Sequence, residues 1–176
     1  MKNHDLIQQW FQEYHEDIYN FLIYYMGTRD VEDIVQEVFI KGFHHIGHFE
    51  GRSNPKTWLI SIARNIAIDH SRKKKRQQQL FHTLKNLFSG KERVPQDWLL
   101  EDERKKELYE AINNLKPDYR DVVILRGIMD YTSDEASQIL RWPINKVNLT
   151  YHRAVQSLRK KLDAGNWSDN VETINE

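Results

Sequence analysis

The chain of 176 residues lacks several features that mark common protein classes. It has no cysteine, so disulfide bonds and thiolate chemistry are excluded, and this suits a reducing cytoplasm. Its 7 glycines and 4 prolines are few for a turn-rich all-β fold. No run approaches the ~18 apolar residues that a membrane span needs. The N-terminal residues mix acidic side chains into the apolar positions, which is not expected of a signal peptide. We expect a cytoplasmic protein without direct membrane insertion.

Signatures of the common enzyme classes are also missing. There is no glycine-rich phosphate loop, no HExxH zinc motif and no GxSxG nucleophile motif. His44 and His48 could share a helix face as metal ligands, but no third ligand is apparent. The acidic residues between Asp30 and Glu37 suit a solvated or partner-facing helix surface better than a cation site. We therefore expect no catalytic residue, no metal site, no cofactor and no small-molecule substrate.

The formal net charge of +0 conceals a strong segregation of charge along the chain. Residues 51–76 carry eight basic residues and one acidic residue, whereas residues 1–50 carry three basic and nine acidic ones. A second basic segment, residues 141–161, has six basic residues and no acidic one. Two basic segments beside acidic ones indicate a polyanion contacted at two places and a separate partner that prefers acidic residues.

Apolar residues recur at three- and four-residue intervals over most of the chain, which predicts an all-α protein. The expected helices span residues 5–26, 30–43, 55–76, 101–115, 119–129, 132–140 and 144–162. Residues 77–102 lose this period, so we predict a flexible linker there, with room for a short helical piece around residues 80–88. The chain should therefore form two small helical domains, residues 1–76 and 103–163, followed by a polar tail at 164–176.

The last two expected helices have the proportions of a helix-turn-helix. A helix of about nine residues, a short turn at Arg141 to Pro143 and a longer basic helix follow one another. If Val147, Ala154 and Leu158 pack inward, the opposite face is polar and basic. That face carries Lys146, Asn148, Leu149, His152, Arg153 and Gln156. Such side chains reach base edges and phosphates in a major groove, although helical hairpins also occur without DNA binding.

The stretch WLISIARNIAIDHSRKKKR, residues 58–76, begins as an aliphatic helix and ends in five consecutive basic residues. On this helix Trp58, Ser61, Asn65 and Arg72 lie near one another at three-, four- and seven-residue spacing. An aromatic ring, an amide and cations on one face suit a single strand with an unstacked base. Trp58 could equally be a core residue, and the basic run could be a solvated helix end.

Three segments, in order, resemble the sigma-70 family, specifically the extracytoplasmic-function group of bacterial RNA polymerase sigma factors. DVEDIVQEVFIKGF (30–43) is similar to the segment of that family that binds core polymerase. Residues 49–76, FEGRSNPKTWLISIARNIAIDHSRKKKR, are similar to its −10 segment. Their sequence resembles in particular that of the X-type sigma factors of bacilli. LKPDYRDVVILRGIMDYTSDEASQILRWPINKVNLTYHRAVQSLRKKL (115–162) is similar to its −35 domain.

The resemblance implies a transcription initiation factor that takes core RNA polymerase to −10/−35 promoters and helps open the DNA. The residues matching positions that face the polymerase clamp are Asp33, Gln36 and Glu37. Those matching the −10 contact are Phe49, Trp58, Ser61, Arg64, Asn65, Arg72, Lys73 and Arg76. Those matching the −35 contact are Lys146, Asn148, Leu149, His152 and Arg153, in a domain that sits on the polymerase flap. The resemblance also implies control by a membrane-bound anti-sigma factor.

The chain departs from the family pattern in its −35 domain. Glu135-Ala136-Ser137 replaces the usual Glu-Ile-Ala, Pro143 stands where a Ser or Thr cap is common, and Asn148 and Leu149 replace a basic residue and a serine. The −35 sequence therefore cannot be carried over from relatives. Three alternatives stay open at this point: a stand-alone helix-turn-helix regulator, a metal-dependent helical nuclease, and a protein that binds polymerase without DNA.

Overall fold

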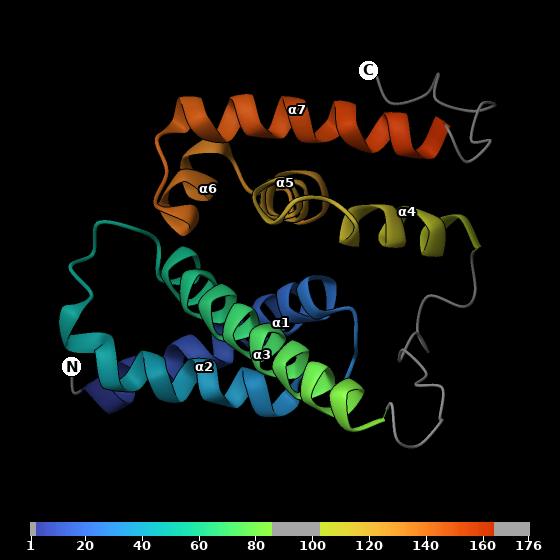
Figure 1. The fold of residues 1–176 in the computed structure, drawn as a ribbon. Helices are drawn as coiled ribbons and strands as arrows, with labels where there is room; N and C mark the ends of the chain where they lie inside the picture. The colour runs from blue at the N-terminus through green and yellow to red at the C-terminus, as the bar shows by residue number, and fades with distance from the viewer. Residues whose placement is uncertain (1–2, 86–102, 164–176) are drawn as a thin grey trace. The chain divides into compact units, whose positions relative to one another are not determined.

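The computed structural model describes residues 3–85 and 103–163, and all regular structure in these two ranges is helical (Figure 1). The prediction of an all-α protein is therefore confirmed. The chain divides into two compact units, residues 1–98 and 99–176, which are described separately below. Of the predicted linker at 77–102, residues 77–85 are helical, and residues 86–102 lie outside the described residues, as does the predicted polar tail at 164–176.

Three helices build the first unit: α1 (Asn3–Met26), α2 (Glu32–His45) and α3 (Pro55–Lys85), with a single 3-10 turn, η1 (Ile46–His48), after α2. Each of the three packs against the other two. Their facing stripes supply a continuous aliphatic and aromatic core. Its fully buried members include Ile18, Phe21, Leu22, Val35, Val38, Leu59, Ile60 and Ile66. These residues follow the helical spacing that the sequence predicted.

Local signals in the sequence set where these helices begin and end. The amide of Gly27 donates to Ile23 O at 2.8 Å, and the φ of Gly27 is 72°, a conformation that glycine adopts without steric cost. Asn54 Oδ1 accepts the amide of Lys56 at 2.9 Å, and Pro55 occupies the first helical position of α3. Helix α3 therefore begins at residue 55, where the sequence predicted it to begin.

Helix α2 passes through Gly42, which lies at a close approach of α2 to α3. A Cβ built on Gly42 would stand 3.2 Å from Leu59 Cδ2 and 3.4 Å from Ile7 Cδ1. The absence of a side chain at this position lets α1, α2 and α3 approach one another, and α2 continues to His45.

Helix α3 continues to Lys85, beyond the end near Arg76 that the sequence predicted. The apolar period fades after Ile68 because the helix leaves the core there, and residues 72–77 are exposed. Glutamine, lysine and leucine favour helix without packing, and the first glycine after this point is Gly90. Loss of the period therefore marked the end of burial and not the end of the helix.

The second unit contains α4 (Glu103–Asn113), α5 (Pro117–Val123), α6 (Ser133–Leu140) and α7 (Ile144–Asp163). Helix α7 packs against the other three. The core is built from residues such as Ile112, Val122, Ile124, Leu125, Ile139, Val147 and Ala154. Ala136 and Val147 are fully buried, so the unusual alanine of the α6 segment still serves as a core residue.

The helix predicted at 119–129 begins earlier and ends differently. Pro117 is its first residue, because proline at that position fixes a helical φ and leaves no amide unsatisfied. After Val123 the backbone widens into a π turn, η2 (Ile124–Ile128), in which the amide of Met129 donates to Ile124 O at 3.0 Å. Such wide turns are often found at functional sites.

The turn between α6 and α7 is tightly specified. Thr132 caps α6 in a capping box, since its hydroxyl accepts the amide of Glu135 at 3.2 Å and Glu135 Oε2 accepts the amide of Thr132 at 2.8 Å. Arg141 ends α6 with φ 55°, and the amide of Trp142 then donates to Ser137 O at 3.0 Å. This turn sets the entry of α7, as a helix-turn-helix requires.

Candidate nucleic-acid and polymerase interfaces

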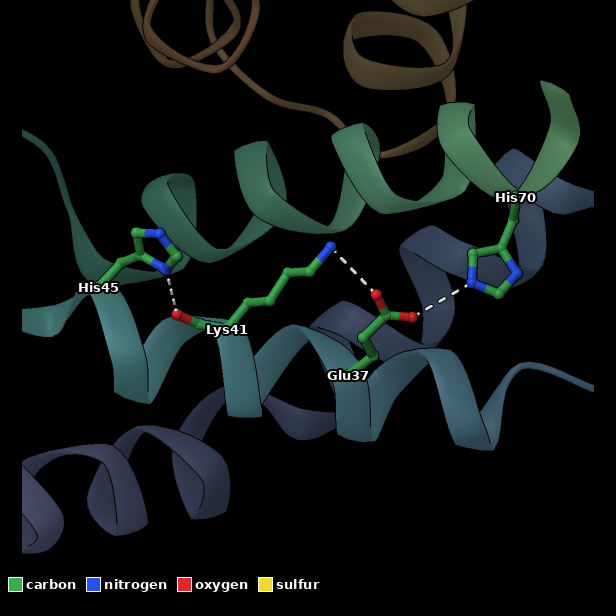
Figure 2. A network of polar contacts seen from close by, with 4 residues as sticks. All are labelled: Glu37, Lys41, His45 and His70. Atoms are coloured by element: carbon green, nitrogen blue, oxygen red, sulfur yellow. Dashed lines mark hydrogen bonds and ion pairs between the residues drawn. The ribbon is translucent and has the colours of Figure 1, made fainter. Parts of the chain in front are cut away.

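The residues predicted to face polymerase lie along the outer side of α2. Asp33 and Gln36 are exposed, whereas Glu37 is half-buried. Glu37 links two helices, because its carboxylate accepts Lys41 Nζ at 3.0 Å and meets His70 Nε2 of α3 at 3.1 Å (Figure 2). His45 Nδ1 meets the carbonyl oxygen of Lys41 at 2.8 Å one turn further along α2. His70 was missed at the sequence level, since nothing local indicates a contact across 33 residues.

This network changes the acidity of Glu37. Partial burial raises the pKa of its carboxyl, but the hydrogen bonds from Lys41 and His70 outweigh burial and leave the pKa below its ordinary value. The carboxylate is therefore ionised and held in place across the neutral range. A negative charge held by Lys41 and His70 also orients the outer face of α2 relative to α3.

Two large apolar side chains on the same helix are exposed. Ile40 is 57% accessible and Phe43 is 42% accessible, and they follow Gln36 and Glu37 at helical spacing. Exposed apolar groups rimmed by polar ones are typical of protein-binding surfaces. Neither residue was predicted from the sequence as a contact residue, although both lie outside the core stripe of Val31, Ile34, Val35, Val38 and Phe39. We call Asp33, Gln36, Glu37, Ile40 and Phe43 the α2 outer face.

Phe49 and Trp58, both predicted to contact the −10 element, lie together. Their ring centroids are 5.3 Å apart, and Trp10 of α1 packs edge-on against each of them at 5.0 and 5.9 Å. Trp10 is buried, whereas Phe49 and Trp58 are half-buried. Trp58 thus packs on the buried Trp10 and is itself partly accessible, and its contact with DNA stays a prediction. We call these three residues the aromatic cluster.

The other predicted −10 residues follow the length of α3. The Ser61 hydroxyl donates to Trp58 O at 2.6 Å, so its proton is already used within the helix. Arg64 is half-buried and Asn65 is exposed one turn beyond Ser61. Arg72, Lys73 and Arg76 are exposed further along, in the part of α3 that has left the core. The structure therefore brings Phe49, Trp58 and Ser61 together and leaves the cations at a distance along the same helix.

All five predicted −35 residues lie on the exposed side of α7. Lys146, Asn148, Leu149, His152 and Arg153 are exposed, and Leu149 is 51% accessible. On the opposite side Val147 and Ala154 are fully buried, and Leu158 is half-buried. The predicted division of this helix into packed and outward sides is confirmed.

Three of these side chains have partners within the unit, and that of His152 is Gln156, with the two Nε2 atoms 3.1 Å apart. Lys146 Nζ lies 3.7 Å above the centroid of the Trp142 ring, which holds the cation near the start of α7. Asn148 Oδ1 accepts hydrogen bonds from Ser133 Oγ at 2.6 Å and from Arg126 Nη1 at 3.3 Å. Arg126 and Ser133 were not identified from the sequence, because they lie on η2 and α6 and meet Asn148 only in the fold.

Neither a cluster of metal ligands nor a membrane-spanning helix is found in the part of the chain that the structure describes. No group of three or more His, Asp or Glu side chains within residues 3–85 and 103–163 is arranged to hold a metal ion. Over the same ranges no helix combines the length and apolar character needed to cross a bilayer.

Comparison with known proteins gives two family matches in the expected order. Residues 10–77 match the family model described as sigma-70 region 2, and residues 105–158 match that of sigma-70 region 4. Bacillus subtilis SigX, an extracytoplasmic-function sigma factor, is 35% identical over 167 residues, covering 90% of this chain and 84% of SigX. SigW from the same organism is 31% identical over 160 residues, covering 83% of this chain and 86% of SigW.

Solved structures agree with this assignment. The complex of the sigma factor RpoE with the anti-sigma factor NepR from Bartonella quintana matches with a TM-score of 0.64 at 25% identity, covering 89% of this chain and 96% of that chain. CnrH, solved with the cytosolic domain of CnrY, shares the fold with a TM-score of 0.68 at 21% identity, over 93% and 91% of the two chains. The chain therefore belongs to the extracytoplasmic-function sigma factors, the transcription initiation factors that direct RNA polymerase to promoters.

Proposed function

We propose that the three surfaces described above divide the work of promoter recognition. The α2 outer face binds the clamp of core RNA polymerase. The aromatic cluster, with Asn65 and the cations of α3, holds the −10 element, and the exposed side of α7 reads the −35 element. Residues 1–76 and 103–163 act as the two functional domains. The chain works in the bacterial cytoplasm and carries no catalytic residue, cofactor or metal, since the phosphodiester chemistry belongs to the polymerase.

This proposal rests on one observation: two surfaces of the first unit differ in chemistry, and each suits a different partner. A partly accessible aromatic cluster includes Trp58, which lies on the helix that continues into five basic residues. Aromatic rings accept the face of an unstacked base, and cations bind the strand that carries it. The α2 outer face is acidic and apolar instead, which suits a protein partner with basic and apolar groups.

A stand-alone DNA-binding regulator would need only the second unit. That hypothesis gives no role to the exposed Ile40 and Phe43 or to the aromatic cluster. We further propose that an anti-sigma factor controls this chain, because the RpoE structure similar to it contains one. The family resemblance implies that this regulator is membrane-bound, and the α2 outer face is the surface it would cover to block polymerase.

The direct test is transcription in vitro. Sigma-free core polymerase from a Bacillus-like bacterium is mixed with this protein and fragmented genomic DNA, and the 5′ ends of the RNA are sequenced. Starts that require the protein and share paired −10 and −35 elements support the proposal. A footprint on palindromic DNA without polymerase, together with no protein-dependent starts, would support the stand-alone regulator.

The polymerase contact has a test of its own. Ile40→Glu should lower affinity for core polymerase by at least about tenfold, because it removes an apolar contact and adds a charge that binding would desolvate. Its thermal unfolding should stay unchanged, since Ile40 is 57% accessible. The matched control is Gln12→Glu, which adds the same charge at an exposed position of α1. Equal affinity of the two variants would place the polymerase contact elsewhere.

A further inference from the structure

The amide of Asn148 is held in one orientation by its neighbours. Its Oδ1 accepts Ser133 Oγ at 2.6 Å and Arg126 Nη1 at 3.3 Å. Arg126 Nη1 also donates to Ser133 Oγ, so the three side chains form a closed triangle that joins η2, α6 and α7. Asn148 itself is exposed and lies in the first turns of α7, the part of a recognition helix that reaches base edges.

The chemistry of arginine determines which end of the amide faces inward. A guanidinium has only donors, so the Asn148 atom next to Arg126 must be the oxygen and not the nitrogen. An amide oxygen has two lone pairs, and here Ser133 and Arg126 each use one. The NH2 group is therefore what Asn148 offers to a ligand.

The triangle resists rearrangement. Arg126 is half-buried, with its guanidinium carbon 5.2 Å from the centroid of the Tyr151 ring. No acceptor among the described residues reaches its buried Nε. Turning the Asn148 oxygen outward would take a further acceptor from this guanidinium, which is costly for a partly buried charge. The backbone of Ser133 is likewise fixed, since Ser133 is the first residue of α6 and lies between the two residues of the capping box.

Asparagine usually reads adenine with both ends of its amide, accepting from N6 and donating to N7. With the oxygen occupied, only the donating half of that pair is available. Guanine presents two acceptors, N7 and O6, in the major groove, and thymine presents O4. Adenine places a donor beside its single acceptor, and cytosine presents only a donor.

We infer that Asn148 is a donor-only specificity residue that selects guanine or thymine, and not adenine, at one position of the −35 element. The inference rests on the proposed function, because it assumes that α7 enters the major groove of that element. The selected base is set jointly by Asn148 and by Arg126 and Ser133 behind it, which do not themselves need to touch DNA.

The test is selection by the holoenzyme. Core polymerase is combined with the full chain and with promoter DNAs randomised through the −35 element, and bound DNAs are sequenced. On the contacted strand, which dimethyl sulfate and permanganate interference identify, the wild-type protein should enrich guanine or thymine over cytosine and adenine at one position. The enrichment should be roughly tenfold, in line with the discrimination of a good base contact. Asn148→Asp keeps an oxygen for Arg126 and Ser133 but turns an acceptor outward, so the same position should change towards cytosine or adenine.

Two further variants sharpen the result. Ser133→Ala frees one lone pair of the Asn148 oxygen, so adenine should gain at that position while the rest of the element stays unchanged. Asn145→Asp is the matched control, because it adds the same charge at an exposed neighbour on α7. It should weaken binding to all sequences without changing the preferred base. Circular dichroism confirms that each variant is folded.

Several outcomes would overturn the inference. Adenine preference by the wild-type protein at the position that Asn148→Asp alters would show that the oxygen reads bases. Uniform weakening by Asn148→Asp, equal to that of Asn145→Asp, would show that the amide meets only phosphate. If the wild-type protein selects −10 sequences but nothing upstream, the −35 assignment of α7 fails. If it selects no promoter DNA at all, the proposed function fails as well.

Discussion

The two units present different chemistry to nucleic acid. In the first, the central feature is a cluster of three aromatic rings, Trp10, Phe49 and Trp58. A run of cations lies further along α3. In the second, it is a triangle of hydrogen bonds among Arg126, Ser133 and Asn148. Rings suit a base that has left the stack, whereas fixed hydrogen-bonding groups suit the edges of paired bases. The contrast fits a division between melted and duplex DNA.

The most severe way to break this comparison is to remove the buried ring of the first unit. Trp10→Ala should destabilise that unit by about 3–5 kcal/mol, because Trp10 is 4% accessible and its loss leaves a large cavity. Urea denaturation followed by circular dichroism measures the change. Phe11→Ala is the control, since Phe11 is 41% accessible and should cost far less. Equal losses would mean that the aromatic cluster is not anchored through Trp10.

The next change separates melting from duplex binding. Asn65→Ala should lower promoter opening by roughly tenfold, the loss expected of a base contact, and leave initial duplex binding nearly unchanged. The folded state should be unaffected because Asn65 is exposed. Permanganate footprinting of the holoenzyme on promoter DNA reports opening. Gln77→Ala removes another exposed amide from the same helix and serves as the control. Normal melting by Asn65→Ala would remove Asn65 from the −10 contact.

A smaller and sequence-independent effect is expected in the second unit. Arg153→Ala should weaken −35 binding across all sequences and lower the slope of log affinity against log salt by about one, as the loss of one phosphate contact does. Binding of the holoenzyme over a series of salt concentrations measures this slope. Asn113→Ala, at a neutral exposed residue of α4, should leave it unchanged. If Arg153→Ala instead relaxes the choice of one base, Arg153 reads sequence.

The smallest effect concerns the link between α2 and α3. Because the folded-state pKa of Glu37 lies below its ordinary value, its ionised form stabilises the fold above that value and ceases to do so as the pH falls through the folded pKa. Glu37→Gln should therefore cost about 0.5 kcal/mol or less at neutral pH, since the group is partly exposed, and nothing in strong acid. Unfolding of both proteins from neutral to acidic pH measures this. A difference that persists in strong acid would exclude the charge as its cause.

The sequence was sufficient for features that depend on local pattern. The packed stripes of α1 and α2, the Asn54 cap and the two sides of α7 were all predictable, because burial and helix geometry impose a period. The end of α3 was not, since the helix continues through residues 72–77, which are exposed and lack an apolar period. Where a helix is no longer buried, the apolar pattern of its sequence no longer indicates that the backbone is helical.

Features that need distant residues were also out of reach. The Glu37 to His70 link and the triangle around Asn148 join segments that approach one another only after folding. The π turn of η2 has no composition signature, yet it is the element that carries Arg126. The sequence thus named Asn148 as a contact residue but could not indicate which end of its amide would face outward.

The exposed run Arg72–Arg76 has a geometric consequence. Successive residues of an α-helix are turned by about 100°, so five in a row point in every direction around the axis. Positive charge on all sides of the helix attracts a phosphate strand from any direction. It does not set the register of that strand. It therefore suits the approach and sliding of a strand, while final alignment requires directional groups. In the proposed function, capture and alignment of the strand are therefore separate steps along one helix.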